Sequence, residues 1–377
     1  MQDIKICKPL FILPNLCGGG AERVVLNLLR QMDKNLFKPT LLLLKNEGVF
    51  WSEVPEELNI IYFSDNNERI HENFLEKWIN IQPVIQSSDI IIGCLELDAT
   101  YWAFGLAKYF RKPVIGWVHT PIGPYLNNVK LIHSLLTKII YPKLNLLVFP
   151  SQQVQTSMSV TLLMEKLSNK IIPNPVDIEL IQEMGAQVLP DWAKQIYQKK
   201  VILGMGRLES TKNFKLLIEA FAIVIQSGLD ANLIILGEGN QRCELEGLVT
   251  ELGLNNNVFL PGFISNPYPF MKNSTIFVMP SHIEGFGMAI VEALGLGIPV
   301  IANGMTPVLE WVLQDGKYGL LLKSNMPIEL SDLIINLVRD QDLRIALSDK
   351  GFIRASEFSS SKIISEWQDL LWVLTHN

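Results

Sequence analysis

The sequence predicts an α/β protein made of two doubly wound domains, each built around a parallel sheet. Its 377 residues suit two domains, because one domain usually holds roughly 100–200 residues. Short apolar segments alternate with helical segments along the chain, which is the rhythm of βαβ units. The same alternation starts again in the second half, so we expect one domain in each half.

Ten short apolar segments are predicted to be strands. They are residues 9–13, 40–44, 89–94, 113–119, 146–149, 200–205, 231–236, 257–260, 275–279 and 298–302. Most are apolar on both faces, as expected for strands that helices cover on both sides.

The repeat is clearest where a strand leads into a loop and a helix, at residues 11–32 and again at 201–225. Between these halves, two prolines within residues 172–177 predict a stiff, extended connection. We therefore expect an N-terminal domain over residues 1–175 and a C-terminal domain over 176–360. Open α/β sheets bind ligands at the carboxyl ends of their strands, so two such domains facing each other would hold a ligand in the cleft between them.

The composition excludes several classes of protein. With 48% hydrophobic and 19% charged residues, the chain can bury a large core and is not a disordered or low-complexity protein. Its 32 Lys and Arg against 38 Asp and Glu give a net charge of −6, so we expect no nucleic-acid partner.

Neither export nor a membrane span is indicated. The apolar piece at residues 9–14 is shorter than the roughly 7–15 residues of a signal-peptide core, and no run reaches the roughly 18 charge-free apolar residues of a spanning helix. The four cysteines, Cys7, Cys17, Cys94 and Cys243, form no CxxC pair. These features predict a cytoplasmic protein in a reducing compartment.

The glycine-rich loops match neither the dinucleotide-binding pattern nor the phosphate-loop pattern GxxxxGK[ST]. After Gly18-x-Gly20, Gly204-x-Gly206 and Gly237-x-Gly239, the third glycine of GxGxxG is replaced by Arg23, Glu209 and Arg242. A dinucleotide dehydrogenase is therefore not indicated. Such loops can still present backbone N–H groups to an anion.

The most informative segment, residues 280–295, follows a predicted strand and opens a helix. Glu284 lies before the helix and Glu292 inside it, with seven residues between them. Gly285 and Gly287 would leave room for a phosphate at the first-turn N–H groups, and ribose hydroxyls could satisfy a glutamate buried in an apolar helix. The alternative is that Glu284 caps the first turn and Glu292 is a partly exposed helix residue.

A second loop, also after a predicted strand, carries Arg207 and Lys212. Two cations at the carboxyl end of a strand suit a diphosphate, since arginine offers a planar fork and lysine a compact charge. Two ordinary charges in a solvated loop are the alternative. His119, at the end of the strand predicted at residues 113–119, is a candidate by its position, although a lone histidine is more often structural.

Four segments in chain order resemble the family-4 retaining glycosyltransferases of GT-B fold. They are residues 18–23, 172–177, 206–213 and the two-glutamate motif from Glu284 to Glu292. The similarity runs over nearly the whole chain and is clearest from about residue 172 to 302. It implies two Rossmann-like domains facing across a cleft, and a C-terminal helix, residues 361–377, that crosses back onto the N-terminal domain.

The resemblance also implies that the C-terminal domain binds a nucleotide-sugar donor. Arg207 and Lys212 would hold the diphosphate, Glu284 would contact donor-sugar hydroxyls, and Glu292 would contact the ribose. His119 matches a family position near the donor sugar. The other positions implied to contact the donor are Gly19 and Gly20, Gly206, Phe263 and Ile264 against the base, and Phe286, Gly287 and Met288 at a phosphate. The chain departs from the family pattern at residues 237–240, where a proline or aspartate often follows the second glycine.

Transfer of a sugar would leave negative charge on the diphosphate. Arg207, Lys212 and the helix that begins near Gly287 would stabilise this charge, so neither a metal nor a further cofactor is expected. A DxD sequence at residues 340–342 lies far from the proposed site and is interpreted as a surface turn. Retention without a protein nucleophile suggests attack on the face that the leaving group occupies.

The N-terminal domain is expected to hold a saccharide or lipid-linked saccharide acceptor. Glu96 and Asp98 follow a predicted strand and could bind a sugar or act as a base, although structural turn acids are the favoured interpretation. Residues 127–143 form a basic amphipathic pattern that could lie on the inner face of an anionic membrane. The favoured alternative is a helix packed on the sheet with a solvated basic edge.

Three functions remain open. The leading one is a retaining transferase for a hexose or N-acetylhexosamine, with UDP preferred over GDP by general resemblance to bacterial surface-glycan enzymes. A nucleotide-sugar epimerase or a sugar phosphorylase would share the architecture. A non-catalytic partner subunit is the third, and the presence of Arg207, Lys212 and Glu284 argues against it.

Overall fold

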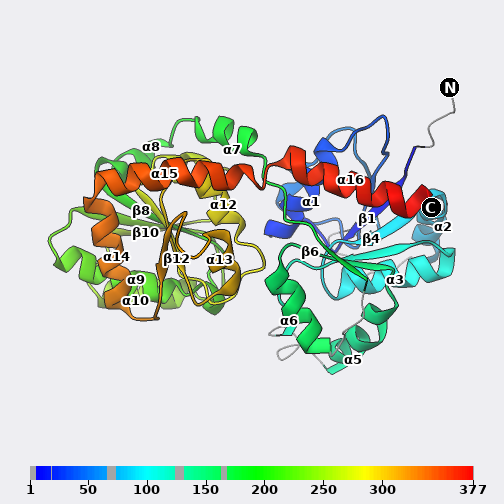
Figure 1. Ribbon diagram of the computed structural model, residues 1–377, viewed down its shortest axis with the longest axis horizontal. Helices are drawn as coiled ribbons and strands as arrows, with labels where there is room; N and C mark the ends of the chain where they lie inside the picture. The colour runs from blue at the N-terminus through cyan, green and yellow to red at the C-terminus, as the bar shows by residue number, and fades with distance from the viewer. Residues whose placement is uncertain (1–5, 18, 66–73, 124–130, 163–167, 377) are drawn as a thin grey trace. The chain divides into compact units, whose positions relative to one another are not determined.

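The computed structural model describes residues 6–17, 19–65, 74–123, 131–162 and 168–376. The chain divides into two compact units (Figure 1). Unit 1 comprises Met1–Pro175 together with Ser360–Asn377, and unit 2 comprises Val176–Ser359.

Within the described residues, the sheet of unit 1 has seven parallel strands in the order β3-β2-β1-β4-β5-β6-β7. They are β1 (Pro9–Leu13), β2 (Thr40–Leu43), β3 (Asn59–Tyr62), β4 (Ile90–Gly93), β5 (Val114–Trp117), β6 (Leu146–Phe149) and β7 (Asn169–Ile171). The strand order reverses between β1 and β4, and doubly wound sheets bind ligands at such a reversal.

Helices cover the sheet of unit 1. They are α1 (Gly20–Gln31), α2 (Phe74–Ser87), α3 (Asp98–Phe110), α5 (Leu131–Ile140), α6 (Gln152–Leu162) and α16 (Ser360–His376). The helix α3 packs on β1, β4 and β5, and α16 packs on α1 and β4.

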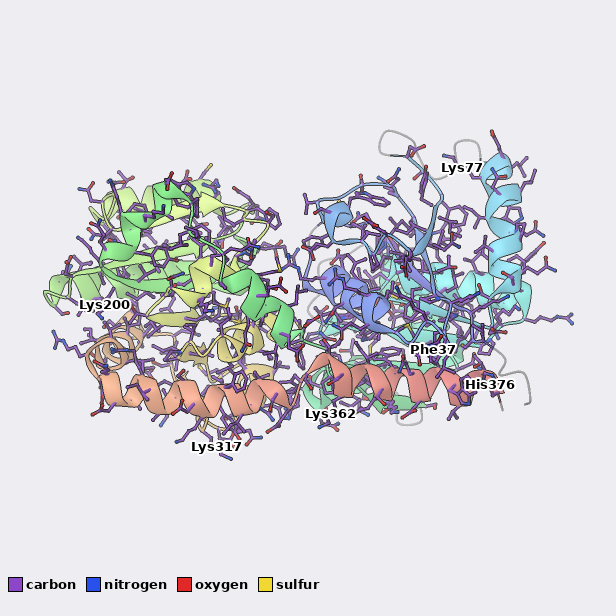
Figure 2. The ribbon with its side chains drawn as sticks, turned by 90° about the horizontal axis from the view of Figure 1, so that it is seen from above. Phe37, Lys77, Lys200, Lys317, Lys362 and His376 are labelled. Atoms are coloured by element: carbon purple, nitrogen blue, oxygen red, sulfur yellow. The ribbon has the colours of Figure 1, made fainter. Side chains whose placement is uncertain are left out.

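The last helix belongs to unit 1. Trp367 is fully buried, with its ring centroid 4.4 Å from that of Trp117. Farther along α16, Trp372 meets Phe37 edge-on at 6.4 Å, and Figure 2 shows Phe37 beside this part of the helix. The large apolar residues near the C-terminus therefore pack on the first half of the chain, as the resemblance implied.

The sheet of unit 2 has six parallel strands in the order β10-β9-β8-β11-β12-β13. They are β8 (Lys200–Met205), β9 (Ala231–Leu236), β10 (Val258–Gly262), β11 (Ile276–Met279), β12 (Val300–Asn303) and β13 (Leu320–Leu322). Here the order reverses between β8 and β11, so the loops that follow these two strands flank the expected ligand position.

Two groups of helices pack against the sheet of unit 2. They are α9 (Phe214–Gln226), α10 (Arg242–Glu251) and α14 (Pro327–Arg339) in one group, and α7 (Ile178–Gly185), α11 (Tyr268–Lys272), α12 (Met288–Gly295) and α15 (Gln341–Ser356) in the other. The shorter α8 (Asp191–Lys194) and α13 (Pro307–Val312) complete the unit. Figure 1 shows the strands between these groups.

All ten predicted strands are confirmed, and three further strands, β3, β7 and β13, were missed. Each missed strand lies at the edge of a sheet and has three or four residues, most of them at least partly exposed. Polar residues interrupt the apolar pattern in β3 and β7, and β13, although it consists of three leucines, is shorter than the apolar segments predicted as strands.

We expect Trp367→Ala to lower the free energy of unfolding by about 3–5 kcal/mol, the usual cost of truncating a buried tryptophan. Val373→Ala, at a position on the same helix that is 53% exposed, serves as the control and should change it by no more than about 0.5 kcal/mol. Urea denaturation followed by circular dichroism measures both. Equal stability of the two variants would contradict the packing of α16 on unit 1.

Candidate functional site

Two loops meet at the strand-order reversal of unit 2. Residues 206–213, here the cation loop, follow β8, and residues 280–287, the acid loop, follow β11. The strands β8 and β11 are parallel neighbours, with Ile276 opposite Ile202, so both loops leave the same edge of the sheet. The N–H of His282 donates to the carbonyl of Thr211 at 2.8 Å and fixes one loop against the other.

The convergence of these loops forms an ion pair. The Nζ of Lys212 lies 2.6 Å from the Oε1 of Glu284, and the two side chains are 18% and 10% exposed. Each charge compensates the other in a place that water reaches only partly, and loss of one partner would leave the other charge poorly solvated. An incoming anion could take the place of Glu284 beside Lys212, and the carboxylate would then be available to hydroxyl groups.

The acid loop is shaped by Gly287 and Phe286. Gly287 has φ +81°, and a Cβ there would lie 2.9 Å from a methyl carbon of Leu309. It precedes α12, where the N–H of Ile290 donates to the carbonyl of Gly287 at 2.9 Å, and the N–H groups at the very start of such a helix can bind an anion. Phe286 is buried, and its ring meets those of Phe358 at 5.2 Å and Trp311 at 6.0 Å. The ring of Phe286 therefore anchors the acid loop in an apolar cluster. Met288, which follows Gly287, is the first residue of α12.

Arg207 is placed differently from Lys212. Its guanidinium is 2.9 Å from a carboxylate oxygen of Glu209, within the same loop, and its side chain is 58% exposed. The structure thus brings Lys212 and Glu284 together, while Arg207 stands at the solvent side of the cation loop and pairs with another acid. Glu209 had not been expected to take part.

Two glycines let the loop that follows β9 approach the cation loop. A Cβ on Gly237 would lie 1.9 Å from the carbonyl oxygen of Gly206, and a Cβ on Gly239 would lie 2.4 Å from that of Leu208. The N–H of Gly237 donates to the carbonyl of Gly262 at 2.9 Å. Residues 262–264, here the base turn, are the turn expected to lie against the base. This hydrogen bond ties the base turn to the loop that follows β9.

The base turn leaves part of its surface open. Phe263 is 45% exposed, and Ile264 is partly buried beside it. An exposed aromatic ring next to a glycine turn offers a flat apolar surface of the kind on which a nucleobase can rest.

Glu292 is buried within α12 at 5% exposure, so the alternative of a partly exposed helix residue is wrong. The hydroxyl of Tyr268 donates to its Oε1 at 3.2 Å. Tyr268 follows the base turn by a few residues and is itself buried. Nothing in a single sequence marked this tyrosine, because its spacing from Glu292 reflects tertiary packing and no local pattern.

In unit 1, His119 lies two residues beyond β5 and is 4% exposed. Its ring packs against that of Trp117, tilted by 37° with the centroids 4.6 Å apart, and neither ring nitrogen makes a hydrogen bond with any residue that the structure describes. Burial lowers the pKa of His119 to about 3, and the nearby backbone of Cys94 has a smaller effect in the opposite direction. The imidazole is therefore neutral at pH 7 and retains one donor and one acceptor.

Glu96, beyond β4, is a structural turn acid. Its Oε1 accepts hydrogen bonds from the backbone N–H of His119 and, at 2.6 Å, from that of Thr120. An oxygen engaged in this way is poorly placed to act as a base. Asp98, by contrast, is an exposed first residue of α3.

The N-terminal glycine loop is described from residue 19 onward, and Gly18 lies outside the described residues. Gly19 is the N-cap of α1, and a Cβ there would lie 2.3 Å from the carboxylate of Glu22. Gly20 is the exposed first residue of the helix.

Comparisons with known proteins identify the family. Residues 18–180 match the model of Glycosyltransferase Family 4, and residues 191–353 match that of the Glycosyl transferases group 1. An uncharacterized glycosyltransferase of Methanocaldococcus jannaschii is 32% identical over 287 residues, which are 68% of this chain and 70% of that protein. The chain belongs to the family-4 glycosyltransferases.

Other relatives align with a larger part of this chain. The N-acetylgalactosamine-N,N'-diacetylbacillosaminyl-diphospho-undecaprenol 4-alpha-N-acetylgalactosaminyltransferase of Campylobacter jejuni is 29% identical over 358 residues, covering 93% of this chain and 95% of that one. The structure of Anabaena HepE in complex with UDP and glucose aligns with a TM-score of 0.82 at 20% identity, over 97% of this chain and 99% of that one. WaaG, a glycosyltransferase of lipopolysaccharide biosynthesis, aligns with a TM-score of 0.68 at 16% identity, over 96% and 99%. These likenesses confirm the GT-B fold.

The DxD sequence of the glycosyltransferase serves its fold. Asp340 caps α15, with its Oδ1 accepting the N–H of Leu343 at 2.8 Å, and Asp342 lies in the first helical turn. Within the described ranges, no three His, Cys, Asp or Glu side chains are grouped as metal ligands. Among the described helices, none has both the length and the apolar character that a bilayer span requires.

The glycosyltransferase should lose stability through His119 as the pH falls. The pKa of His119 is about 3 in the folded state and about 6.5 in the unfolded chain, so between these values the unfolded chain binds a proton that the folded chain does not. The free energy of unfolding therefore falls as the pH drops from about 6.5 towards 3. The expected loss is at most about 1.4 kcal/mol per pH unit. Chemical denaturation of the wild type and His119→Leu from pH 7 to 4 should give a shallower decline for the variant. Parallel declines would contradict the assignment.

Proposed function

We propose that this glycosyltransferase moves a hexose or N-acetylhexosamine from a UDP-sugar to a saccharide or lipid-linked saccharide acceptor, with retention and without a metal. The observation that carries the proposal is the Lys212–Glu284 ion pair at the strand-order reversal of unit 2. It sets a cation for a diphosphate beside an acid for sugar hydroxyls, at the edge of the sheet where doubly wound folds bind nucleotides.

The donor would bind unit 2 by exchanging partners within this pair. Lys212 would turn from Glu284 to the diphosphate, where Arg207 and the N–H groups of Gly287 and Met288 add positive potential. Glu284, released from the lysine, would accept hydrogen bonds from the transferred sugar. Glu292 would do the same for the ribose.

The preference for UDP draws support from the bound nucleotide in the HepE structure, whose fold this chain shares. The lipid-linked acceptor draws support from the name of the Campylobacter jejuni relative, which specifies a diphospho-undecaprenol-linked saccharide. Both features are part of the proposal for this chain. We include in the proposal that the reaction takes place at the cytoplasmic face of a membrane, which the likeness to surface-glycan enzymes supports.

In the proposed reaction, cationic residues stabilise the leaving group and a neutral residue contacts a sugar hydroxyl. As the bond between the anomeric carbon and the phosphate oxygen breaks, negative charge grows on the diphosphate, and Lys212 and Arg207 stabilise it. The acceptor oxygen bonds to the same face of that carbon, and its proton passes to the departing phosphate oxygen. A neutral His119 suits a contact with an uncharged sugar hydroxyl and would contribute little to holding phosphate.

A region for membrane contact is offered by α5. Four apolar side chains of this helix are exposed: Leu131 (86%), Ile132 (51%), Leu135 (53%) and Ile139 (44%). Lys138 is exposed on the same helix. The favoured alternative, in which the apolar residues face the sheet, therefore fails for these four positions, although Thr137 and Ile140 are buried. Residues 127–130 of the predicted segment lie outside the described residues. We include in the proposal that this face of α5 lies on an anionic lipid surface.

Lys212→Ala and Glu284→Ala should each reduce turnover by about 10²-fold or more, a typical loss for a contact made in the transition state. Lys215→Ala, an exposed lysine on the next helix, is the matched control and should be active. Mass spectrometry of products from UDP-sugars and an acceptor panel measures transfer, with one arm in excess EDTA.

Transfer near the wild-type rate in both site variants would overturn the site assignment. Isomerised donor without transfer would indicate an epimerase, and no reaction in any pairing would favour a partner subunit. Loss of activity in EDTA that magnesium restores would contradict the metal-independent mechanism.

Replacement of Leu131 and Leu135 by Glu should at least halve co-sedimentation with vesicles that contain phosphatidylglycerol, because charge on the apolar face opposes insertion. Leu75→Glu, on α2 and 76% exposed, is the matched control. Replacing Lys138 should weaken binding further at low salt, by about 1 kcal/mol. Binding that is unchanged by both α5 substitutions would remove the membrane contact from the proposal.

A further inference from the structure

One carboxylate holds the chain segment that carries His119. The strands β4 and β5 are parallel neighbours with Gly93 opposite Gly116, so the loops after them leave the same edge of the sheet. Glu96 comes three residues after β4 and reaches across to the backbone of His119 and Thr120. Two consecutive N–H groups thus converge on a single oxygen.

We infer that Glu96 is a positioning residue for the transfer reaction, fixing the backbone at residues 119–120 and thereby the direction of the His119 imidazole. The inference rests on the proposed contact of His119 with a sugar hydroxyl. It assigns no chemical step to Glu96, since its Oε1 is occupied by the two N–H groups.

The orientation of His119 depends on this backbone restraint. The ring packs at a tilt against Trp117, which in turn meets Trp367, so packing sets the plane of the imidazole. No hydrogen bond from the described residues holds either ring nitrogen. The direction in which these nitrogens point therefore follows from where the main chain places the Cα of His119, and that main chain is held by Glu96.

Both the burial of the Glu96 carboxyl and the backbone conformation of the next residue are unfavourable by themselves. Burial raises the pKa of the Glu96 carboxyl, while hydrogen bonds from the backbone and from Thr120 oppose the rise. The next residue, Leu97, has φ +61° and ψ −111°, a conformation that is strained for a residue with a Cβ. The N–H of Leu97 donates to the hydroxyl of Tyr141 at 3.2 Å, which helps to hold the turn. Strain of this kind gathers where a precise direction is required.

The test measures turnover and UDP affinity for Glu96→Ala, Glu96→Asp and Glu96→Gln, each alone and with His119→Ala. Glu96→Ala should lower kcat by about tenfold or more, because a small misplacement of a contact group is costly. UDP affinity should stay within about twofold, since the UDP-binding groups proposed above belong to unit 2. Glu76→Ala, which removes an exposed acid on α2 of the same unit, is the matched control and should keep full activity.

The two conservative variants separate position from charge. Glu96→Gln keeps an acceptor oxygen in place and should recover most of the activity, whereas Glu96→Asp keeps the charge but draws the oxygen back and should remain impaired. With His119 already replaced by Ala, none of the three substitutions should lower kcat further, because the group that they position is gone. If Glu96→Ala does not fold, Glu96→Asp supplies the same cycle.

Each contrary result has one meaning. Equal losses with and without His119, or a parallel loss of UDP affinity, would show that Glu96 supports the fold in general and would overturn the inference. Impairment by His119→Ala but not by any Glu96 variant would overturn the inference alone. Full activity of His119→Ala would remove the proposed contact of His119 and the inference with it, while the role of Lys212 and Glu284 would still stand on its own variants.

Discussion

The ion pair between Lys212 and Glu284 is the interaction on which the rest of the site in unit 2 depends. It exists because the strand order reverses between β8 and β11, which brings two loops distant in sequence to one edge of the sheet. Gly237 allows the backbone of the cation loop to come close, Gly287 leaves room for the side chain of Leu309, and Phe286 anchors the acid loop on an aromatic cluster. A diphosphate that enters this site must compete with a carboxylate for the lysine.

The candidate groups of the two units differ in their chemistry. Unit 2 supplies cations and a helix N-terminus, which suit a leaving group that gains negative charge. Unit 1 supplies a buried, neutral imidazole, which suits an uncharged hydroxyl. Burial alone produces this difference in His119, because desolvation disfavours the protonated ring.

The sequence predicted the inner strands and the glutamate and lysine of the site because both follow local rules. Buried strands are continuously apolar, and strand ends of a parallel sheet share an edge, so Lys212 and Glu284 could be placed near each other. The edge strands β3 and β7 were missed because polar residues break that pattern, and β13 was missed because its apolar segment has only three residues. Tyr268 beside Glu292, Glu209 beside Arg207, and the reach of Glu96 to residues 119–120 depend on side-chain directions set by packing, which spacing along one chain does not encode.

The exchange of partners at Lys212 is tested most directly by the dissociation constant of UDP, measured by calorimetry for the wild type, Lys212→Met, Glu284→Gln and the double variant. UDP carries no sugar, so Glu284 should act on it only by competing for the lysine. We predict tighter binding to Glu284→Gln, at least tenfold weaker binding to Lys212→Met, as for loss of about 1.4 kcal/mol or more from a charge-assisted contact, and no effect of Glu284→Gln once Lys212 is gone. Weakening of UDP by Glu284→Gln as large as that by Lys212→Met would contradict the account.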